Sequence, residues 1–92
     1  MYKVKFYRDK SGYSAIVDIL DKLKKLGETS KTDRINRNKI LAYMGALEQH
    51  GTRVGEPVVK HIGGQIWELR PLRNRIFFFT GKTTCLLCCT TS

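Results

Sequence analysis

The sequence predicts an α+β fold: an N-terminal strand, two packed helices and then a twisted antiparallel sheet. Between residues 14 and 50 the apolar residues recur every three or four positions, which is the spacing of an amphipathic helix. After Pro57 the pattern changes to short alternating runs that turn residues separate, which is typical of strands. The 92 residues allow one domain with a modest core, so residues 1–92 are expected to fold as a single unit.

One strand and one helix are expected at the N-terminus. Residues 2–7 alternate in hydrophobicity, which predicts a half-buried strand, and residues 9–12 predict a turn. Ser14 can cap the first helix, and Gly27 can follow its last turn as the C′ residue. The apolar stripe of this helix consists of Ile16, Ile19, Leu20, Leu23 and Leu26.

A second helix is predicted from about residue 30 to Gly51, where the glycine ends it. Ser30 and Asp33 have the spacing of a capping box, although aspartate replaces the usual glutamate. Gly45 lowers the helix propensity, which we attribute to close packing against a neighbouring element. The apolar stripe of this helix consists of Ile40, Met44 and Leu47.

Three strand-like runs follow between residues 58 and 79. Gly63–Gly64 suits a tight hairpin, because glycine reaches positive φ without a Cβ clash. Pro71 and Asn74 are expected to form the corners of the second turn. Alternation then places four apolar side chains on one face as the core face, namely Trp67, Leu69, Ile76 and Phe78.

The opposite face of these runs carries a charged cluster. Glu68, Arg70 and Arg75 point to the same side, and Arg73 lies at the rim of the turn that joins their strands. Arginine pairs two oxygens of one phosphate with its planar fork and stays charged at any working pH. The cluster therefore predicts a phosphate-binding site, with an arginine-rich solvated face as the alternative interpretation.

The charge balance favours a polyanionic partner. The chain has a net charge of +9, from 17 Lys and Arg against 8 Asp and Glu. Nucleic acid, an acidic protein or an anionic membrane surface would each fit this excess better than a basic surface kept only for solubility. No apolar run approaches the roughly 20 residues of a membrane helix, and no apolar signal-peptide region begins the chain. We therefore expect a cytoplasmic protein without a membrane partner.

The stretch from residue 80 onward, TGKTTCLLCCTTS, is atypical. A further sheet strand is expected here, but the residues do not alternate between polar and apolar. One back-translation, read one base earlier, restores an alternating apolar stretch, so we hypothesise a frameshift and truncation after Phe79. Cys85 and Cys88 have the spacing of zinc ligands but lack a second pair, and the odd, clustered cysteines do not suggest disulfides. No metal site is therefore expected.

Two stretches are distinctive when they occur together: YKVKFYRDKSG at the N-terminus, and VVKHIGGQIWELRPLRNRIFFF after the two predicted helices. With these stretches the chain resembles the RelE/HigB-like toxins of bacterial type II toxin–antitoxin systems, particularly their phage-associated branch. WELR, followed shortly by RIFF, is the most specific part, and the resemblance covers residues 1 to about 79. Family members usually continue with a strand and a lysine-rich C-terminal helix, which this sequence lacks.

The resemblance implies a metal-free ribonuclease without a cofactor, which enters the ribosomal A site and cleaves mRNA. A cognate antitoxin of the HigA-like, helix-turn-helix kind would inhibit it, and operator DNA would be contacted only through that complex. By position, Arg70 and Arg75 match the strand arginines of the family, while Arg73 and Lys60 match less closely. We accordingly assign Arg70 and Arg75 to phosphate neutralisation during attack by the RNA 2′-hydroxyl, and Arg73 to clamping the substrate.

The remaining candidate residues each have two interpretations. Glu68 can act as a general base or as an ion-pair partner that holds the arginines, and the second role is favoured because carboxylates beside arginines make poor bases. Lys60 and His61 can contact RNA, although the face of their strand is ambiguous and His61 can equally be structural. Phe77 can stack on a base from the open face or pack in the core.

Two functions compete with that of a toxin endoribonuclease. The chain can be a basic nucleic-acid-binding module without catalysis, or an antitoxin-bound regulatory protein whose truncation has removed activity. A translation assay separates these possibilities, because only the toxin would cut mRNA and inhibit translation.

Overall fold

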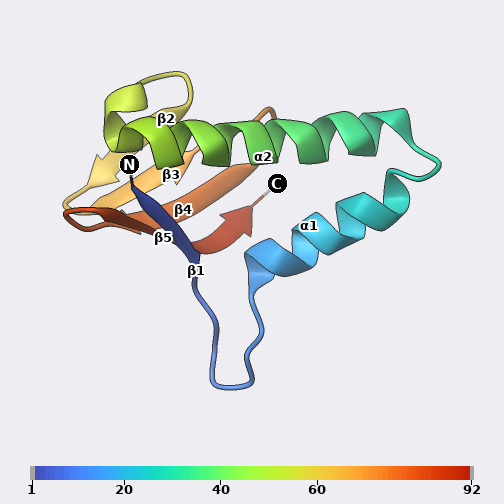
Figure 1. The fold of residues 1–92 in the computed structure, drawn as a ribbon, viewed down its shortest axis with the longest axis horizontal. Coiled ribbons are helices and arrows are strands. Elements are labelled where there is room, and N and C mark those ends of the chain that lie inside the picture. The colour runs from blue at the N-terminus through green and yellow to red at the C-terminus, as the bar shows by residue number, and fades with distance from the viewer. Residues whose placement is uncertain (1, 92) are drawn as a thin grey trace.

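Two helices and one five-stranded sheet make up the structure, a computed structural model that describes residues 2–91 (Figure 1). This arrangement confirms the α+β prediction, and a short 3₁₀ helix (η1) joins the helices to the later strands. None of the helices within residues 2–91 is long and apolar enough to cross a membrane. The elements in chain order are β1 (Lys3–Phe6), α1 (Ala15–Leu26), α2 (Lys31–His50), η1 (Gly51–Val54), β2 (Val59–Gly63), β3 (Ile66–Leu69), β4 (Arg75–Thr80) and β5 (Thr84–Thr91).

β5 lies inside the sheet, whose strand order is β1-β5-β4-β3-β2. β1 pairs with β5 in parallel, whereas β4 pairs with β5 in antiparallel orientation. The β2–β3 and β3–β4 pairs are antiparallel as well. The expectation that the sequence lacks a strand after Phe79 is therefore wrong. The frameshift hypothesis itself stays a prediction, which resequencing the gene would decide.

The last strand does not show in the residue pattern because the residues on its two faces do not differ in polarity. Cys85 and Leu87 are buried, and the Cys85 thiol serves there as a small apolar group. Leu86 and Cys88, which alternate with them, are half-buried and are not polar either. The alternation of β5 is thus present in its burial but not in the polarity of its residues.

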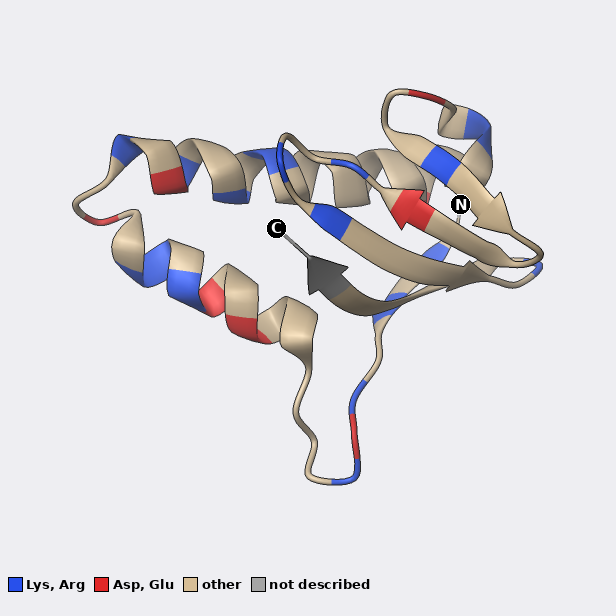
Figure 2. Cartoon of the chain, turned by 180° about the vertical axis from the view of Figure 1, so that it is seen from behind, with Lys and Arg blue, Asp and Glu red and all other residues tan. Residues whose placement is uncertain are grey.

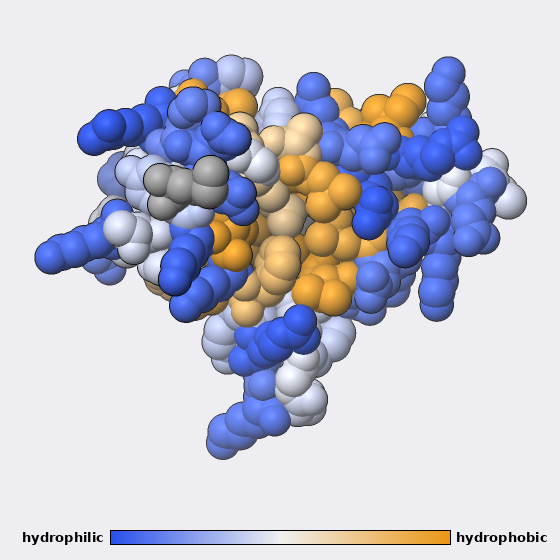
Figure 3. All heavy atoms as spheres, viewed as in Figure 1, coloured by the Kyte–Doolittle hydropathy of each residue, from blue (hydrophilic) through white to orange (hydrophobic). Residues whose placement is uncertain are grey.

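The core lies between the sheet and the two helices. α2 runs over the sheet, and α1 packs against α2 and β5 (Figure 1). The predicted stripe of α2 is buried, whereas Leu26, at the end of the stripe of α1, is 53% exposed. In the middle of this side of the molecule, where the helices and the sheet meet, an apolar band stays visible (Figure 3). The core residues that are at most 1% exposed are Ile16, Ile40, Leu47, Val59, Leu69, Ile76, Phe78, Cys85 and Leu87.

Both predicted helix caps are confirmed. The Ser14 hydroxyl accepts a hydrogen bond from the Val17 backbone N–H at 3.3 Å. The Ser30 hydroxyl accepts one from the Asp33 backbone N–H, also at 3.3 Å. Each cap pairs one of the N–H groups that the first turn of a helix leaves without a partner.

The three glycines of the helical region have different roles. Gly51 ends α2 as predicted, with a φ of 59°, and a Cβ there would lie 2.6 Å from the Tyr2 ring. Gly27 follows the last turn of α1 as predicted, but with a φ of −66° it is right-handed, so the end of this helix does not use the left-handed conformation that is common at such glycines. The attribution of Gly45 to close packing is wrong, because no atom lies within 4 Å of an added Cβ.

Both predicted turns of the sheet are present, but the second is built differently from our expectation. Gly64 has a positive φ of 55°, as a tight hairpin requires. In the β3–β4 turn it is Leu72 that adopts positive φ, at 57°, which is uncommon for a residue with a side chain. Asn74 is buried instead, and its amide donates hydrogen bonds to the Pro71 carbonyl and to the Asn36 side chain of α2. Asn74 thus fastens the turn to the helical layer.

Candidate functional site

The charged cluster forms where β3 and β4 pair. Leu69 of β3 is opposite Ile76 of β4, and both side chains are fully buried in the core. Glu68 and Arg75, their neighbours in sequence, therefore point to the other face of the sheet, which is turned away from α2 (Figure 2). Arg70 follows the last residue of β3 and reaches the same carboxylate. The structure thus brings together three of the four residues of the predicted cluster.

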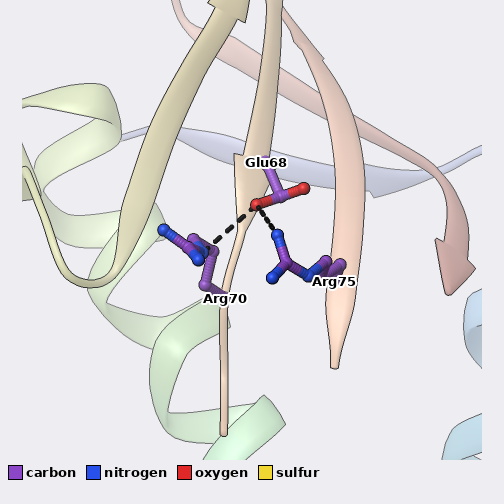
Figure 4. A network of polar contacts seen from close by, with 3 residues as sticks. All are labelled: Glu68, Arg70 and Arg75. Atoms are coloured by element: carbon purple, nitrogen blue, oxygen red, sulfur yellow. Dashed lines mark hydrogen bonds and ion pairs between the residues drawn. The ribbon is translucent and has the colours of Figure 1, made fainter. Parts of the chain in front are cut away.

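One carboxylate oxygen holds both arginines. Glu68 Oε1 lies 3.2 Å from Arg70 Nε and 3.2 Å from Arg75 Nη1 (Figure 4). The Glu68 side chain is only 5% exposed, whereas the Arg70 side chain is 34% and the Arg75 side chain 50% exposed. The carboxylate is therefore at the bottom of the cluster and the guanidinium groups form its surface. Two guanidinium groups against one carboxylate leave one positive charge in excess.

This arrangement can bind a further anion. A guanidinium group presents five N–H donors in a rigid fork, and each of these arginines contacts Glu68 through one nitrogen. The other donors belong to half-exposed side chains and can pair the oxygens of a phosphate group. Because both groups already converge on one oxygen atom, their spacing suits a single shared oxyanion.

Two other predicted residues border Glu68 on the same face. The strand register aligns Lys60 of β2, Glu68 of β3 and Phe77 of β4 in one row across the sheet. Directly opposed residues of paired strands point to the same side, so Lys60 lies on the side of the arginines. Lys60 is exposed and Phe77 is half-buried. The row therefore places a cation on one side of the carboxylate and an aromatic ring on the other.

His61 and Arg73 lie outside this group. His61 is opposite Trp67, with the ring centroids 4.6 Å apart, and its Nε2 is 2.8 Å from the Gly64 carbonyl oxygen. Since His61 follows Lys60 in the strand, it points to the other face of the sheet. Arg73 is part of the β3–β4 turn and lines a cavity of about 510 Å³ together with the first turns of α2. Arg73 thus lies in the turn where the sequence placed it, but the side to which the turn directs it, like the face of His61, depends on the path of the turn and on the register.

A known family matches most of the chain. Residues 27–91 match the family model described as phage derived protein Gp49-like (DUF891). The chain belongs to this family. The Gp49-like family is of the type II toxin–antitoxin, RelE/HigB-like kind. The matched stretch contains α2, the strands β2 to β5 and all the residues of the predicted site. A search of curated proteins found no match.

The Gp49-like sheet also carries an apolar row that reasoning from the sequence missed. Ile66, Phe79 and Leu86 are aligned across β3, β4 and β5, on the same face as Glu68. Ile66 is 38% and Phe79 is 46% exposed, and Lys5 of β1 completes the row. The alternation of the phenylalanines in β4 was a signal for part of this surface. Leu86 could not be placed there without β5.

The cysteines of this Gp49-like chain are dispersed over different environments. Burial raises the pKa of the Cys85 thiol, and burial together with the neighbouring Cys89 raises the pKa of the Cys88 thiol. Cys88 Sγ also lies 3.5 Å from the Leu86 carbonyl oxygen. Among residues 2–91, no group of three or more His, Cys, Asp or Glu residues is arranged to hold a metal ion. Burial thus favours the neutral thiol over the thiolate at Cys85 and Cys88.

Proposed function

We propose that this Gp49-like protein is a RelE/HigB-like toxin, a ribosome-dependent endoribonuclease that cleaves mRNA and inhibits translation until a cognate antitoxin neutralises it. The observation that carries the proposal is the convergence of Arg70 and Arg75 on one anionic oxygen, at 3.2 Å each. Each guanidinium group contacts Glu68 through one nitrogen only, so its remaining donors can bind the oxygens of an RNA phosphate next to the carboxylate. Membership of a family of the toxin–antitoxin kind supports the same function.

The reaction needs positive charge next to the phosphate. In cleavage by internal transfer, the RNA 2′-hydroxyl loses its proton and its oxygen forms a bond to phosphorus. The bond from phosphorus to the 5′-oxygen breaks, and that oxygen gains a proton. Negative charge on the phosphoryl oxygens grows in the transition state, and preorganised cations stabilise it by a few kcal/mol each. We assign this task to Arg70 and Arg75, which perform it without a metal or other cofactor.

The neighbouring residues position the arginines and the RNA. Glu68 holds both guanidinium groups in place as their ion-pair partner. Lys60 supplies a further phosphate contact, and Phe77 offers a ring on which a base can stack. Arg73 in the β3–β4 turn and His61 on the edge strand β2 lie outside the row of Glu68, so we assign them contacts only with RNA that extends around the rim of the sheet.

Arg75 is the residue to replace first. We expect Arg75→Ala to lower mRNA cleavage in a purified translation system by about 100-fold, which corresponds to about 2.7 kcal/mol of transition-state stabilisation. RNA binding should fall much less, because the other basic residues still supply the sequence-independent attraction. Arg75→Lys should restore only part of the activity, since an ammonium group cannot make the bidentate contact.

Arg53→Ala is the matched control, because it removes the same charge from an exposed position in η1. Circular dichroism establishes that each variant is folded. Cleavage by a folded Arg75→Ala variant at the parental rate would contradict the assignment. Binding of mRNA by the parental protein without cleavage would instead indicate a nucleic-acid-binding module, a function that the net charge of +9 also favours.

We also propose that the antitoxin is an acidic or helix-turn-helix protein of the HigA-like kind that contacts either the basic face of the sheet or the two-helix layer. The net charge of +9 and the apolar band between the helices and the sheet (Figure 3) support such a partner. Electrostatic steering should make the association rate fall as salt is added, because the Debye length shrinks to about 10 Å at 0.1 M. An association rate that is independent of salt would count against this partner.

A further inference from the structure

A cavity of about 350 Å³ lies between the two helices, where the end of α1 passes the beginning of α2 (Figure 1). It is separate from the arginine cluster on the sheet, and none of its lining residues belongs to β3 or β4. The lining includes Lys24, Glu28, Arg34, Arg37 and Asn38. Three basic side chains against one carboxylate leave two positive charges. The cavity therefore has the electrostatic character of an anion site.

Arg37 carries a buried donor without a partner. Its Nε is shielded from solvent and has no hydrogen-bond acceptor within residues 2–91. A buried N–H of a charged group is unfavourable unless an acceptor pairs with it. The Nε edge of a guanidinium is also one of the edges that can pair two oxygens of an oxyanion at once. Arg37 as a whole is half-buried and lines the cavity, so a small turn of its side chain would bring the Nε–H group to an anion bound there, which would supply the missing acceptor.

The Arg34 side chain is held at the wall of the cavity by contacts with Gly27, the residue that follows α1. Its Nη1 donates a hydrogen bond of 2.8 Å to the Gly27 carbonyl oxygen. A Cβ on Gly27 would lie 2.8 Å from Arg34 Cγ, although the φ of −66° at this position suits any residue. The Arg34 side chain and the Leu23 carbonyl oxygen, which would lie 2.9 Å from that Cβ, therefore both favour glycine here, and the backbone conformation does not require it. The packing of the two helices thus places a guanidinium group at a defined position.

We propose that this cavity binds a phosphate monoester, from a free nucleotide or from the 5′-phosphate end of an RNA. A phosphate monoester carries about 1.5 to 2 negative charges near neutral pH, which balances the two positive charges of the lining. A single carboxylate group of a peptide would leave one of these charges unpaired. The volume lies within the roughly 300–1,000 Å³ of small-molecule sites, so a nucleoside monophosphate fits. The proposal does not depend on RNA cleavage at the sheet.

The NMR signal of the Arg37 Nε–H group reports on this cavity directly. When adenosine monophosphate is titrated into the full chain, we expect the chemical shift of the Arg37 Nε–H group to change until binding is saturated. The chemical shift of the Arg53 Nε–H group in η1 should stay unchanged. Phosphates also reach the arginines on the sheet, so the titration is repeated with the Arg75→Ala variant. The shift of the Arg37 signal should persist there with the same affinity, because the two sites share no residue.

Substitutions within the cavity provide the second test. Arg37→Gln should weaken adenosine monophosphate binding at least tenfold, followed through the Gly27 amide signal, whereas Arg53→Gln should leave it unchanged. If Arg37→Gln does not fold, Lys24→Gln provides the same comparison, because Lys24 is exposed and its loss does not open the core. Binding that neither cavity variant weakens would overturn the proposal.

The nature of the ligand follows from a comparison of probes. A response to adenosine monophosphate supports a free nucleotide as the source, and a response to a 5′-phosphorylated RNA tetramer but not to its 5′-hydroxyl form supports an RNA end. An equal response to the 5′-hydroxyl RNA would overturn the assignment to a monoester. An Arg37 signal that stays in place with every phosphate probe would overturn the proposal. An equal response of this signal to tetraglutamate would also overturn it and would indicate an acidic protein segment as the ligand.

Discussion

Replacing Glu68 by glutamine should destabilise the protein only slightly, although Glu68 is the most enclosed member of the arginine cluster. The two arginines that would lose their partner are 34% and 50% exposed, so water can solvate them. Ion pairs with exposed partners contribute about 1 kcal/mol or less, and the glutamine oxygen can still accept a weaker hydrogen bond. We therefore expect Glu68→Gln to lower the free energy of unfolding by about 1 kcal/mol.

Removing both arginines should have a much larger effect. In the double variant Arg70→Ala/Arg75→Ala, a carboxylate that is 5% exposed in the parental protein loses both of its cationic partners. Leaving a buried charge without compensation costs about 3–5 kcal/mol, and we expect about 3 kcal/mol because Lys60 is opposite Glu68 in the sheet. In a domain of this size, each kcal/mol corresponds to about 4–8 °C in Tm. The double variant should therefore melt at least about 12 °C below the parental protein.

A triple variant separates charge from packing. Adding Glu68→Gln to Arg70→Ala/Arg75→Ala removes the unpaired charge, so it should recover about 2 kcal/mol of the lost stability. Urea unfolding, followed by circular dichroism at neutral pH, measures all four proteins. If the triple variant is no more stable than the double variant, the loss comes from the packing of the arginine side chains, and the reasoning from the buried charge is refuted.

Two further predictions concern glycines and thiols. Gly45→Ala should raise the free energy of unfolding by up to about 1 kcal/mol, because the position is open and helical. Gly51→Ala should lower it by at least about 1 kcal/mol, because the φ there is 59° and the Tyr2 ring fills the space. Equal effects of the two substitutions in urea unfolding would refute this contrast. Burial raises the pKa of the Cys85 thiol, so the folded state favours the neutral thiol. The contribution of the neutral Cys85 thiol to the free energy of unfolding should be complete at neutral pH and should decline as the pH rises above the ordinary thiol pKa. Cys85 should also be alkylated more slowly than the exposed Cys89, which mass spectrometry after brief iodoacetamide treatment would test, and equal labelling would contradict it.

The sequence predicts those features of the fold that depend on local physics. Ser14 and Ser30 cap helices because their hydroxyl groups accept hydrogen bonds from backbone N–H groups only a few residues away. Side chains on a strand alternate between two faces, so Leu69 and Glu68 had to separate into core and open face. The arginine cluster was predictable for the same reason, because it lies on two runs that one short turn joins.

The features that the sequence did not predict depend on distant partners. The strand from residue 84 onward is defined by pairing with β1 and β4, and its own residues carry no polar alternation. In the β3–β4 turn Leu72 takes the positive φ, while Asn74 is engaged by Pro71 and by α2, which lies far away in sequence. The face of Lys60 and the unpaired nitrogen of Arg37 likewise become visible only when register and helix packing are known.

The parallel pairing of β1 with β5 joins two segments that are far apart in the sequence. Lys3 lies opposite Thr84, so the sheet cannot close until the residues of β5 have been synthesised. Cys85 and Leu87 of β5 also belong to the core, so the helices have no complete surface to pack on before β5 has been synthesised. Closing so long a loop is a slow, late step in folding. The arginine cluster on β3 and β4 thus becomes part of a closed sheet only after β5 has been synthesised and has paired with β4.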